Sequence, residues 1–471
     1  MTSVRKLNNN LQSVPNPYSN RMPVIHPAQF YGRYDDILHV AQHIRDWQIF
    51  AISGEPRIGK TSFLYFLVHP DGARILPDFS AYIGDPMDYL FVLVELQRLP
   101  RRRGLEFWRY LFDRLVEEAR REGIETEDML AEYESSQESG SDSYEVQAGF
   151  ESYLKQLKRK VALLFDDFDI VINDFERTEV IQVTDKLRTL KETPDLSSKL
   201  NYIIASTDPL VRLFEATAIV NPSALINIII PAPPLGLLEQ DAVDELIQDP
   251  LQTGGTIEQF TRDDIAFIKR LAGRHPDFLK ISCYYLFEAR RQGYVKYDDV
   301  QQSIENDAHL RWLMNGLWER MKQAEALEDL PLREVLLQVA HGQNPTNPRA
   351  FRDLLMRGLI DDSTSPPRIF ADLFCSFILQ PKLTAVEPDK PVFTSLESKL
   401  YSYLLEHAEQ TCTRQELQKA IWGNKIPSSP DALEQLVKRV RKKIEANPEQ
   451  PMYLLNVRGQ GYLLRHGRQG T

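Results

Sequence analysis

Apolar positions occur in two patterns along the first half of the chain, as continuous runs and as amphipathic stretches between them. The continuous runs occupy residues 48–53, 89–96, 161–165, 200–205 and 226–230. Each has the pattern of a buried parallel strand, because a sheet covered by helices on both faces leaves no polar side on its strands. The helical stretches include residues 35–45, 62–68, 105–121 and 149–158. The pattern therefore predicts a doubly wound parallel α/β sheet.

The pattern becomes mostly helical after the proline-rich residues 231–234. Further along, helical stretches at 332–339 and 351–358 precede a short apolar segment at 359–361 and another apolar run at 368–379. That order resembles a compact winged helix. A linker at 380–391 contains three prolines and introduces the C-terminal module. The chain is thus expected to be a multidomain α/β + α protein, with an arm at 1–29, a sheet domain at 30–235, a helical lid at 236–310, a winged helix at 311–385 and a C-terminal module at 386–471.

Two segments are expected to lack regular structure. The arm is rich in proline and asparagine, and it is expected to run extended over the surface. The segment 125–146 is acidic and rich in serine, a composition that buries little apolar surface. We expect it to be a flexible insertion in the sheet domain.

A complete phosphate-binding loop follows the first strand. It consists of Gly54, Glu55, Pro56, Arg57, Ile58, Gly59, Lys60 and Thr61, and Ser62 continues into the next helix. The glycines let the backbone turn so that its amides face the phosphates, the lysine reaches the outer phosphates, and the threonine hydroxyl binds Mg²⁺. The N-terminus of the following helix adds partial positive charge. The loop predicts binding of ATP or ADP with Mg²⁺.

Two carboxylates come directly after the strand at 161–165. Asp166 is placed to hold Mg²⁺ through water, together with Thr61, and Asp167 stands where a base would orient the attacking water. Glutamate is more common than aspartate at the second position. An aspartate pair also begins many ordinary loops, but the upstream phosphate loop favours the magnesium interpretation.

Three groups of residues together resemble the STAND class of signal-transduction ATPases, which are relatives of AAA+ proteins. They are Phe30-Tyr31-Gly32-Arg33, Leu163-Leu164-Phe165-Asp166-Asp167-Phe168-Asp169 and Gly273-Arg274-His275-Pro276. The resemblance covers about residues 20–385. It implies an adenine pocket lined by Val24, Ile25, Tyr31, Gly32 and Arg33. It also implies that Pro276 packs on the nucleotide and that His275 lies near the phosphates; the alternative for His275 is an ordinary helix-end histidine.

The sequence departs from this class after the strand at 200–205. It reads Ser206-Thr207-Asp208, where many members place an arginine that senses the γ-phosphate. Ser206 or Thr207 could hydrogen-bond a phosphate or water, but a hydroxyl does not neutralise the charge on the transferring group. We therefore expect slow hydrolysis, or none without a partner. The nucleotide would act mainly as a latch between the sheet domain and the lid.

The net charge of −11 is distributed unevenly. Residues 391–471 contain 12 Lys+Arg and 8 Asp+Glu, which gives +4, so the preceding residues carry −11 − 4 = −15. Such asymmetry suggests that the C-terminal module and the rest of the chain face different partners.

Residues 392–466 closely resemble the OmpR/PhoB-type winged helix. The resemblance rests on helical stretches at 396–405, 413–417 and 432–445, on Ile421-Trp422-Gly423, and on a hairpin at 453–464 with Val457-Arg458-Gly459-Gln460-Gly461-Tyr462 as its wing. Thr413 and Glu416 have the spacing of a capping box. The resemblance implies a module that binds double-stranded DNA.

The third helix of this module supports DNA binding through its spacing. Leu433, Val437, Val440 and Ile444 form a buried stripe. Gln435, Arg439 and Lys442 lie on another face, where glutamine suits adenine and arginine suits guanine. The residues expected at phosphates are Lys438, Arg441 and Lys443. Arg458 is expected in the minor groove, and Trp422 and Tyr462 against the DNA backbone as in the family.

Two departures and two alternatives accompany this interpretation. Leu436 stands where many members have a polar residue, and Asn456 stands where threonine is common. A basic helix can also be a solvated face, or the module can bind protein instead of DNA. Upstream, the chain shows a nucleotide-binding pattern in place of a phospho-acceptor receiver domain, so we expect nucleotide to replace phosphorylation as the control.

The cysteines, the N-terminal sequence and the lengths of the apolar runs indicate in which compartment the protein is expected. Cys283, Cys375 and Cys412 have no paired spacing, which supports neither a disulfide framework nor a zinc site. The N-terminus lacks the apolar core of a signal peptide, and no apolar run approaches the ~20 residues of a membrane span. A reducing cytoplasm fits best.

The sequence thus predicts a cytoplasmic, ATP-dependent transcriptional regulator. Its nucleotide state would control conformation or self-association, in response to an unknown protein or ligand signal. One alternative is a STAND-type sensor of stress or phage signals whose winged helix binds protein. Another is an active ATPase that remodels nucleic-acid complexes.

Overall fold

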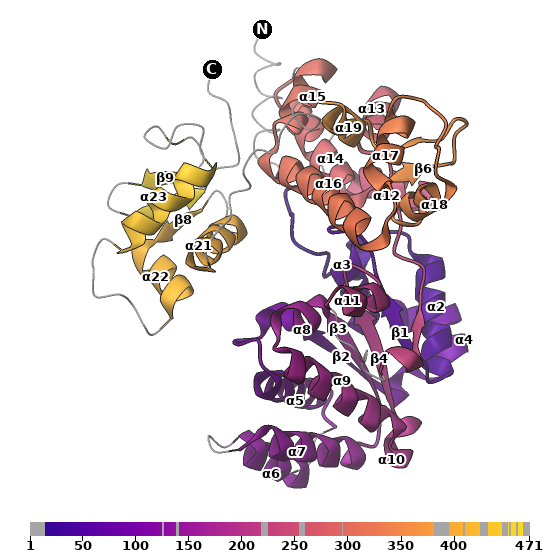
Figure 1. The fold of residues 1–471 in the computed structure, drawn as a ribbon, viewed down its shortest axis with the longest axis vertical. Helices are drawn as coiled ribbons and strands as arrows, with labels where there is room; N and C mark the ends of the chain where they lie inside the picture. The colour runs from indigo at the N-terminus through magenta and orange to yellow at the C-terminus, as the bar shows by residue number, and fades with distance from the viewer. Residues whose placement is uncertain are drawn as a thin grey trace. The chain divides into compact units, whose positions relative to one another are not determined.

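The computed structural model describes residues 15–124, 127–137, 141–217, 225–253, 260–293, 295–380, 395–407, 410–423, 432–444, 451, 454–457 and 460–464. The chain divides into two compact units by its internal contacts, and Figure 1 labels the helices and strands. The first comprises residues 1–294 and 317–375, and the second comprises residues 295–316 and 376–471. Within the described residues, no helix has the length and apolar character needed to cross a bilayer.

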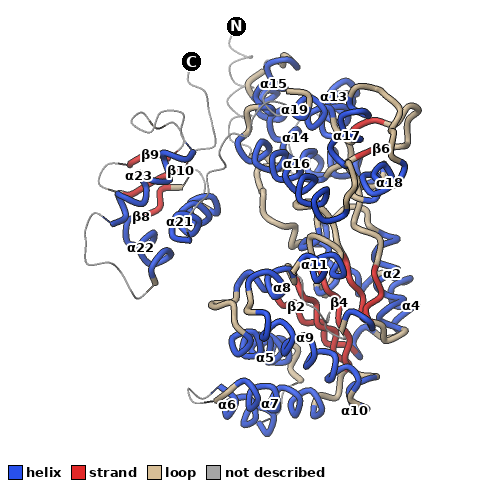
Figure 2. Tube along the Cα trace, viewed as in Figure 1, coloured by secondary structure: helices blue, strands red, loops and turns tan. Residues whose placement is uncertain are grey.

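Five parallel strands, red in Figure 2, form the sheet of the first unit. Their order is β2-β3-β4-β1-β5. They are β1 (Ile49–Ile52), β2 (Tyr89–Glu95), β3 (Lys160–Asp166), β4 (Leu200–Ala205) and β5 (Ile229–Pro231). This confirms the predicted parallel sheet. Because β4 lies between β1 and β3, the phosphate loop after β1 and the carboxylates after β3 meet at the same edge.

Alternate residues of each strand enter two different cores. On one face, residues such as Val92, Leu163 and Tyr202 pack under α5 (Gly104–Arg121), α7 (Ser143–Gln156) and α9 (Arg177–Glu192). On the other face, Phe91 and Leu164 pack under α2 (Tyr34–Arg45), α3 (Lys60–Val68) and α4 (Pro77–Ile83). A sheet covered on both faces explains the continuous apolar runs.

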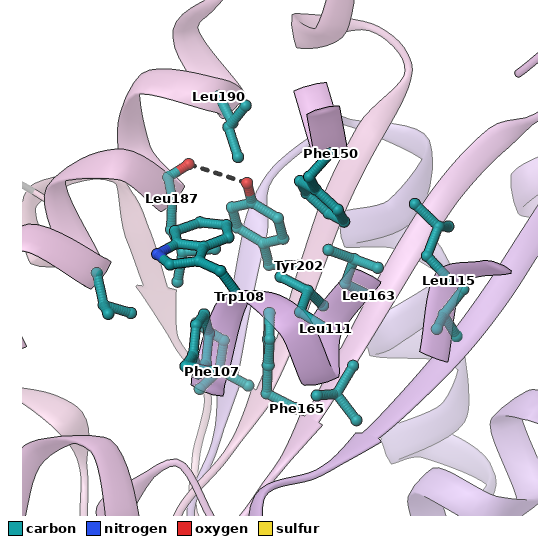
Figure 3. Close-up of a cluster of buried hydrophobic side chains, with 14 of the residues drawn as sticks. Phe107, Trp108, Leu111, Leu115, Phe150, Leu163, Phe165, Leu187, Leu190 and Tyr202 are labelled. Carbon is teal, nitrogen blue, oxygen red and sulfur yellow. Dashed lines mark hydrogen bonds between the residues drawn. The ribbon is translucent and has the colours of Figure 1, made fainter. Parts of the chain in front are cut away.

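Figure 3 shows the first of these cores around α5. Phe107 of the helix stacks on Phe165 of β3 with ring centroids 6.1 Å apart, and Trp108 packs on Phe150 of α7 at 5.9 Å. The one polar atom of Tyr202 is satisfied, because its hydroxyl donates to the carbonyl of Leu187 at 2.9 Å. Aromatic rings thus fill much of this core, and the buried hydroxyl of Tyr202 is hydrogen-bonded.

The expectation of a flexible insertion at 125–146 was wrong for its described residues. They form α6 (Glu127–Gln137) and the beginning of α7, which starts with a capping box between Asp142 and Glu145. Met129 is buried, and the ring of Tyr133 packs edge-on against Phe112 at 5.1 Å. A few well-spaced apolar residues thus anchor an acidic helix, which average composition did not reveal.

The smaller elements of the sheet domain connect these layers. They are α8 (Asp169–Asp174), α10 (Pro194–Ser197), α11 (Leu210–Ala216) and the 3-10 turns Pro27–Gln29, Ala73–Ile75, Pro86–Asp88, Leu96–Arg98 and Ile226–Ile228. The last of these occupies most of the run at 226–230, so the fifth strand is shorter than predicted.

Helices follow the sheet in the first unit. α12 (Gln240–Thr253) and α13 (Arg262–Ala272) both pack on α14 (Pro276–Arg291). Beyond them, α17 (Leu332–Ala340), α18 (Pro348–Met356) and the antiparallel pair β6 (Ile360–Asp361) and β7 (Arg368–Ile369) have the order of a winged helix. That part is called the inner winged helix below, and its role as a separate domain stays a prediction.

Two helices continue through the division between the units. α16 (Ala308–Glu328) and α19 (Asp372–Ile378) each contribute residues to both, and α15 (Tyr297–Glu305) belongs to the second. The predicted boundaries at 310 and 385 therefore do not coincide with the division. Apolar residues run throughout α16, so the sequence held no break that could have marked one.

The C-terminal module of the second unit has its own core. It contains α21 (Ser395–Glu406), α22 (Arg414–Trp422), α23 (Ala432–Ile444) and an antiparallel sheet in the order β8 (Thr411–Thr413), β10 (Gly461–Leu464), β9 (Leu454–Val457). The predicted capping box of Thr413 and Glu416 is present at the start of α22. Strand β8 was not predicted, because three residues are too few for a recognisable pattern.

Candidate nucleotide-binding site and nucleic-acid interface

The phosphate loop joins β1 to α3 in a conformation that requires glycine at its end. Gly59 has φ 108° and caps α3, and Arg57 is also left-handed at φ 64°. Ile58 is buried and anchors the loop in the core. The Lys60 ammonium is buried and donates to the carbonyls of Gly54 at 2.8 Å and Glu55 at 3.2 Å. The lysine thus spans the loop that would surround the phosphates.

Carboxylates gather beside this loop, at the ends of β2 and β3. Glu95 and Asp166 are paired in register, and the Asp166 carboxylate hydrogen-bonds the Thr61 hydroxyl. Burial and the neighbouring Asp167 raise the pKa of Asp166 to about 7. Burial also lowers the pKa of Lys60, although Asp169, Asp167 and Asp166 oppose that shift. The site therefore concentrates both signs of charge in a buried space.

Asp166 and Thr61 fit the requirements of Mg²⁺. Within the described part of the chain, Oδ1 of Asp166 is buried without a hydrogen-bond partner. A hard divalent cation takes oxygen ligands and would compensate such a carboxylate. When bound with ATP, Mg²⁺ would neutralise phosphate charge at this edge. The assignment of both ligands stays a prediction.

Asp167 lies one residue further, at φ 55°. Its Oδ2 accepts from Gln97 Nε2 at 2.7 Å, and burial raises its pKa. Its role as a base stays a prediction. Neither Gln97 nor Glu95, which accepts from the Tyr65 hydroxyl at 2.7 Å, was picked out in the sequence. Their position at the end of a predicted strand was the available signal.

The two hydroxyls after β4 are already occupied. The backbone N–H of Thr207 donates to Asp169 Oδ1 at 2.9 Å, and its hydroxyl donates to the same oxygen. Ser206 Oγ donates to the carbonyl of Asp208 at 2.6 Å. Each side chain thus has a short internal partner, and a hydrogen bond from either to a phosphate stays a prediction.

An arginine from another element contacts the segment after β4. Arg320, on α16, donates through Nη2 to the Thr207 carbonyl at 3.4 Å and lies 3.0 Å from Asp208. Its Nε donates to Glu55 Oε2 at 2.8 Å. An arginine from a distant element thus lies beside the segment after β4, although the segment itself contains none. Arg320 is 113 residues from Thr207, so no local motif could reveal it.

The arm before the loop makes a sharp turn at its Gly-Arg step. Gly32 and Arg33 both have positive φ, and a Cβ on Gly32 would lie 2.4 Å from the Glu239 carboxylate. The Arg33 guanidinium donates to the carbonyls of Ile58 at 3.0 Å and Gly236 at 2.7 Å. It therefore ties the phosphate loop to the segment that leads into the helices.

The other residues of the implied adenine pocket are less enclosed. The backbone N–H of Val24 donates to Ser62 Oγ at 2.9 Å, which places the arm against α3. Tyr31 is half-buried, whereas half of Ile25 is exposed. The adenine pocket of Val24, Ile25, Tyr31, Gly32 and Arg33 stays a prediction.

The Gly-Arg-His-Pro segment connects α13 to α14 and packs against the inner winged helix. Gly273 has φ 59°, and a Cβ there would lie 1.6 Å from the carbonyl of Phe370. The Arg274 guanidinium donates to the Leu238 carbonyl at 3.0 Å and to Asp361 Oδ1 at 3.3 Å. The motif thus needs glycine for close packing as well as for backbone conformation.

His275 caps α14 and is buried as a neutral imidazole. Its Nδ1 accepts from the N–H of Asp277 at 3.3 Å, so the proton belongs on Nε2. Burial lowers the pKa of His275 to about 4, against opposing contributions from Asp277 and the backbone of Pro56 in the phosphate loop. Among the described residues, Nε2 has no partner at full hydrogen-bonding geometry, although the backbone of Pro56 is close enough to raise the pKa. A buried donor of this kind suits a nucleotide oxygen, as the motif implied for His275 and Pro276.

In the second unit, α23 has a buried face and an exposed basic face. Leu433, Leu436, Val437 and Val440 are buried in the core of the module. Gln435, Lys438, Arg439 and Lys442 are all exposed and recur at helical spacing. Leu436, which looked like an unfavourable departure, is a core residue. Asn456 is exposed on β9, so its difference from threonine does not affect the core.

Several residues predicted to contact DNA also make contacts within the module. Tyr462 is 3% exposed and lies in the core, so the expected backbone contact is corrected. Arg441 Nε donates to the Leu454 carbonyl at 2.9 Å, which ties α23 to the hairpin. Arg439 pairs with the buried Glu397 at 3.3 Å yet remains 54% exposed. Trp422 packs partly against the core.

Two predicted contacts have no structural test. Arg458 lies outside the described residues, as does the side chain of Lys443. Base and phosphate contacts by Gln435, Lys438, Arg439 and Lys442 stay predictions.

Known proteins resemble the two ends of the chain separately. A family model described as "Transcriptional regulatory protein, C terminal" matches residues 389–464. The sensory transduction proteins RegX3 of Mycobacterium tuberculosis (strain H37Rv) and Mycobacterium bovis are 32% identical over 114 residues, which is 24% of this chain and 50% of each relative. The chain thus spans half the length of these curated relatives.

The first unit resembles a solved ATPase in fold. The Walker-type ATPase PABY2304 of Pyrococcus abyssi aligns with a TM-score of 0.50 and 12% identity, covering 77% of this chain and 99% of that one. At this identity the likeness shows the fold alone. The chain therefore combines the parallel-sheet fold of P-loop ATPases with a C-terminal OmpR/PhoB-type winged-helix domain of transcriptional regulators.

Proposed function

We propose that this protein is a nucleotide-controlled, DNA-binding transcriptional regulator. The proposal rests on one observation, that the same chain carries a phosphate loop with a fitting magnesium carboxylate and a winged helix with an exposed basic face. The RegX3 relatives, which share the C-terminal module, are named as sensory transduction proteins. A regulator whose DNA binding depends on bound nucleotide accounts for both the phosphate loop and the C-terminal winged helix.

The chain's own residues would bind and orient the nucleotide. Lys60 would move from the carbonyls of its own loop to the outer phosphates, since a phosphate is the stronger acceptor. Thr61 and Asp166 would hold Mg²⁺, and His275 Nε2 would donate to a nucleotide oxygen. These side chains come from both the sheet domain and α14, so a bound nucleotide would bridge the two.

That bridge supplies a physical basis for switching. A ligand shifts a conformational equilibrium only by its difference in affinity for the two states. Contacts from α14 to the nucleotide exist only when α14 lies against the phosphate loop, so a nucleotide favours that arrangement.

The proposal also includes self-association in the ATP state. It is measurable as a molecular mass in solution that depends on the bound nucleotide.

The test is selection of genomic DNA fragments by the full-length protein. We expect wild type with Mg²⁺ and ATP to recover a defined set of fragments, and Lys60→Ala to lose that set or its nucleotide dependence. Lys442→Ala serves as the matched control, because it should weaken recovery without removing nucleotide dependence. Recovery of the same fragments by wild type and Lys60→Ala would contradict control by nucleotide. If no fragment is enriched over the starting DNA, sequence-specific DNA binding is contradicted.

An active ATPase is the second candidate, favoured by Arg320 at the phosphate edge. An arginine there offers the positive charge that the transferring phosphoryl group needs. Steady-state turnover that falls strongly in Asp167→Asn would support an enzyme. Turnover at background in wild type would leave the nucleotide as a ligand only.

A further inference from the structure

A carboxylate of the phosphate loop is turned away from the phosphates and toward two arginines. Glu55 is 3% exposed, and its two oxygens accept from different partners. Oε2 accepts from Arg320 Nε at 2.8 Å, and Oε1 accepts from Arg357 Nη1 at 3.2 Å. Both arginines come more than 260 residues later, since the separations from Glu55 are 265 and 302 residues. The loop is thus directly connected to α16 and to the residue that ends α18.

The two arginines differ in how firmly they are held. Arg357 is buried against four carboxylates: Glu55, Asp208, Asp353 and Glu328, at 3.2, 3.4, 2.6 and 3.3 Å. Removing a guanidinium from such a cluster would leave several buried negative charges uncompensated. Arg357 is therefore a fixed part of the inner winged helix.

Arg320 has fewer partners and is more accessible. It contacts Glu55, Asp208 at 3.0 Å and the Thr207 carbonyl at 3.4 Å, and its side chain is 18% exposed. Its charge also acts on Lys60, where it adds to the effect of burial in lowering the pKa of the ammonium. Arg320 is thus near the lysine that reaches the outer phosphates.

The other arginines around the loop are occupied elsewhere. Arg33 donates to the carbonyls of Ile58 and Gly236, and Arg57 Nη1 donates to the Arg21 carbonyl at 3.0 Å. Arg320 alone among these three points its guanidinium at the residues after β4, where a γ-phosphate contact is expected.

We propose that Arg320 distinguishes a nucleoside triphosphate from a diphosphate at this site, with Glu55 as its partner in the absence of a γ-phosphate. The inference rests on nucleotide binding as proposed above. A terminal phosphate is a stronger acceptor than a carboxylate shared between two arginines, so Arg320 exchanges Glu55 for the phosphate oxygens. Glu55 then keeps Arg357, and no buried charge is left unpaired. Because Arg320 belongs to α16, the exchange changes how that helix contacts the phosphate loop.

The test compares the affinities of full-length protein for ATPγS and ADP with Mg²⁺, by calorimetry. We expect Arg320→Gln to weaken ATPγS about tenfold while ADP changes less than about twofold, since only the triphosphate gains a charge-assisted contact. Glu55→Gln should strengthen ATPγS several-fold and leave ADP unchanged, because Arg320 is released from its competitor. Arg320→Lys should restore part of the lost preference.

Arg212→Gln is the matched control. Arg212 pairs with Asp353 at 2.7 Å and Glu328 at 3.0 Å in the same cluster, and it makes no described contact with the loop. Arg212→Gln should leave the ratio of the affinities for ATPγS and ADP unchanged.

An unchanged ratio in Arg320→Gln, or an equal loss for both nucleotides, would overturn the role of Arg320 while nucleotide binding stands. If wild type binds neither nucleotide, the proposed function fails together with this inference. Should Arg320→Gln fail to fold, Glu55→Gln decides, and an unchanged ratio there overturns the exchange.

Discussion

Two buried polar atoms stand out at the scale of single residues, because burial without a partner is costly unless a ligand compensates it. They are Oδ1 of Asp166 and Nε2 of His275, and within the described residues neither has a partner at full hydrogen-bonding geometry. One is an acceptor beside Thr61, and the other is a donor near the backbone of Pro56. An acceptor for Mg²⁺ and a donor for a nucleotide oxygen are what a phosphate loop of this kind needs around it.

Asp166→Asn tests the magnesium ligand. A neutral amide holds Mg²⁺ less well, so we expect the variant to bind ATPγS about tenfold more weakly in Mg²⁺. Without the metal, its affinity should match or exceed that of wild type, because one negative charge beside the phosphates is removed. Titrations in Mg²⁺ and in EDTA measure both. An equal Mg²⁺ effect in wild type and variant would rule out Asp166 as a ligand.

His275→Gln tests the buried imidazole through pH. The folded-state pKa is about 4, against about 6.5 in an unfolded chain. Below pH 6.5 the unfolded state binds a proton that the folded state does not, so stability is lost as pH falls. The loss from this group reaches about 2 kcal/mol at pH 5.

Urea unfolding at pH 7.5 and pH 5.0 measures this contribution. The acid-induced fall in the free energy of unfolding should be about 2 kcal/mol smaller in His275→Gln than in wild type. The same fall in both proteins would mean that His275 is not buried as a neutral group.

The limits of sequence reasoning at this scale follow from distance along the chain. The phosphate loop, Asp166 and the Gly-Arg-His-Pro segment are local patterns, and the structure brings all three together. The contacts of Glu55 with Arg320 and Arg357 join positions that are 265 and 302 residues apart. No local spacing encodes such pairs, so the sequence did not reveal that Arg320 of α16 lies beside the phosphate loop.

At the scale of elements, the hydrophobic pattern predicted the helices and strands of the sheet domain well, whereas average composition predicted them poorly. The five strands were predicted because continuous apolar runs of this kind are needed when helices cover both faces of a sheet. The acidic segment at 127–137 was misjudged, because Met129 and Tyr133 suffice to anchor it on the sheet domain. Strand β8 is defined by its pairing with β10 rather than by its own three residues.

The two faces of α23 should respond oppositely to substitution. Leu436 is fully buried, so Leu436→Ala should destabilise the C-terminal module by about 2–5 kcal/mol. Lys442 is exposed, so Lys442→Ala should change stability by less than about 0.5 kcal/mol. If Lys442 contacts a phosphate, its removal should reduce the slope of log K against log salt by about 1.

Thermal unfolding and DNA titrations at several salt concentrations measure both effects. Loss of stability in Lys442→Ala would show that its face is packed rather than exposed. If the slope of log K against log salt is the same in Lys442→Ala and in wild type, Lys442 does not contact a phosphate. Protein binding would then be the better interpretation of the basic face.

At the scale of the whole molecule, the charges of the two ends agree with separate partners. The +4 of residues 391–471 suits a polyanion, and the −15 of the remaining chain discourages DNA from binding elsewhere. In the proposed function, nucleotide and DNA would be linked by a coupling free energy between two sites, and such coupling is reciprocal. If ATP strengthens DNA binding by some factor, DNA must strengthen ATP binding by the same factor.

The most direct test of nucleotide control is this coupling, measured on full-length protein with a selected DNA fragment at one salt concentration. We predict that the Kd for DNA differs at least about fivefold between Mg²⁺–ATPγS and Mg²⁺–ADP. The same factor should appear in the affinity for ATPγS relative to ADP when DNA is added, and Lys60→Ala should abolish the difference. Equal DNA affinity in the two nucleotide states of wild type would contradict the account.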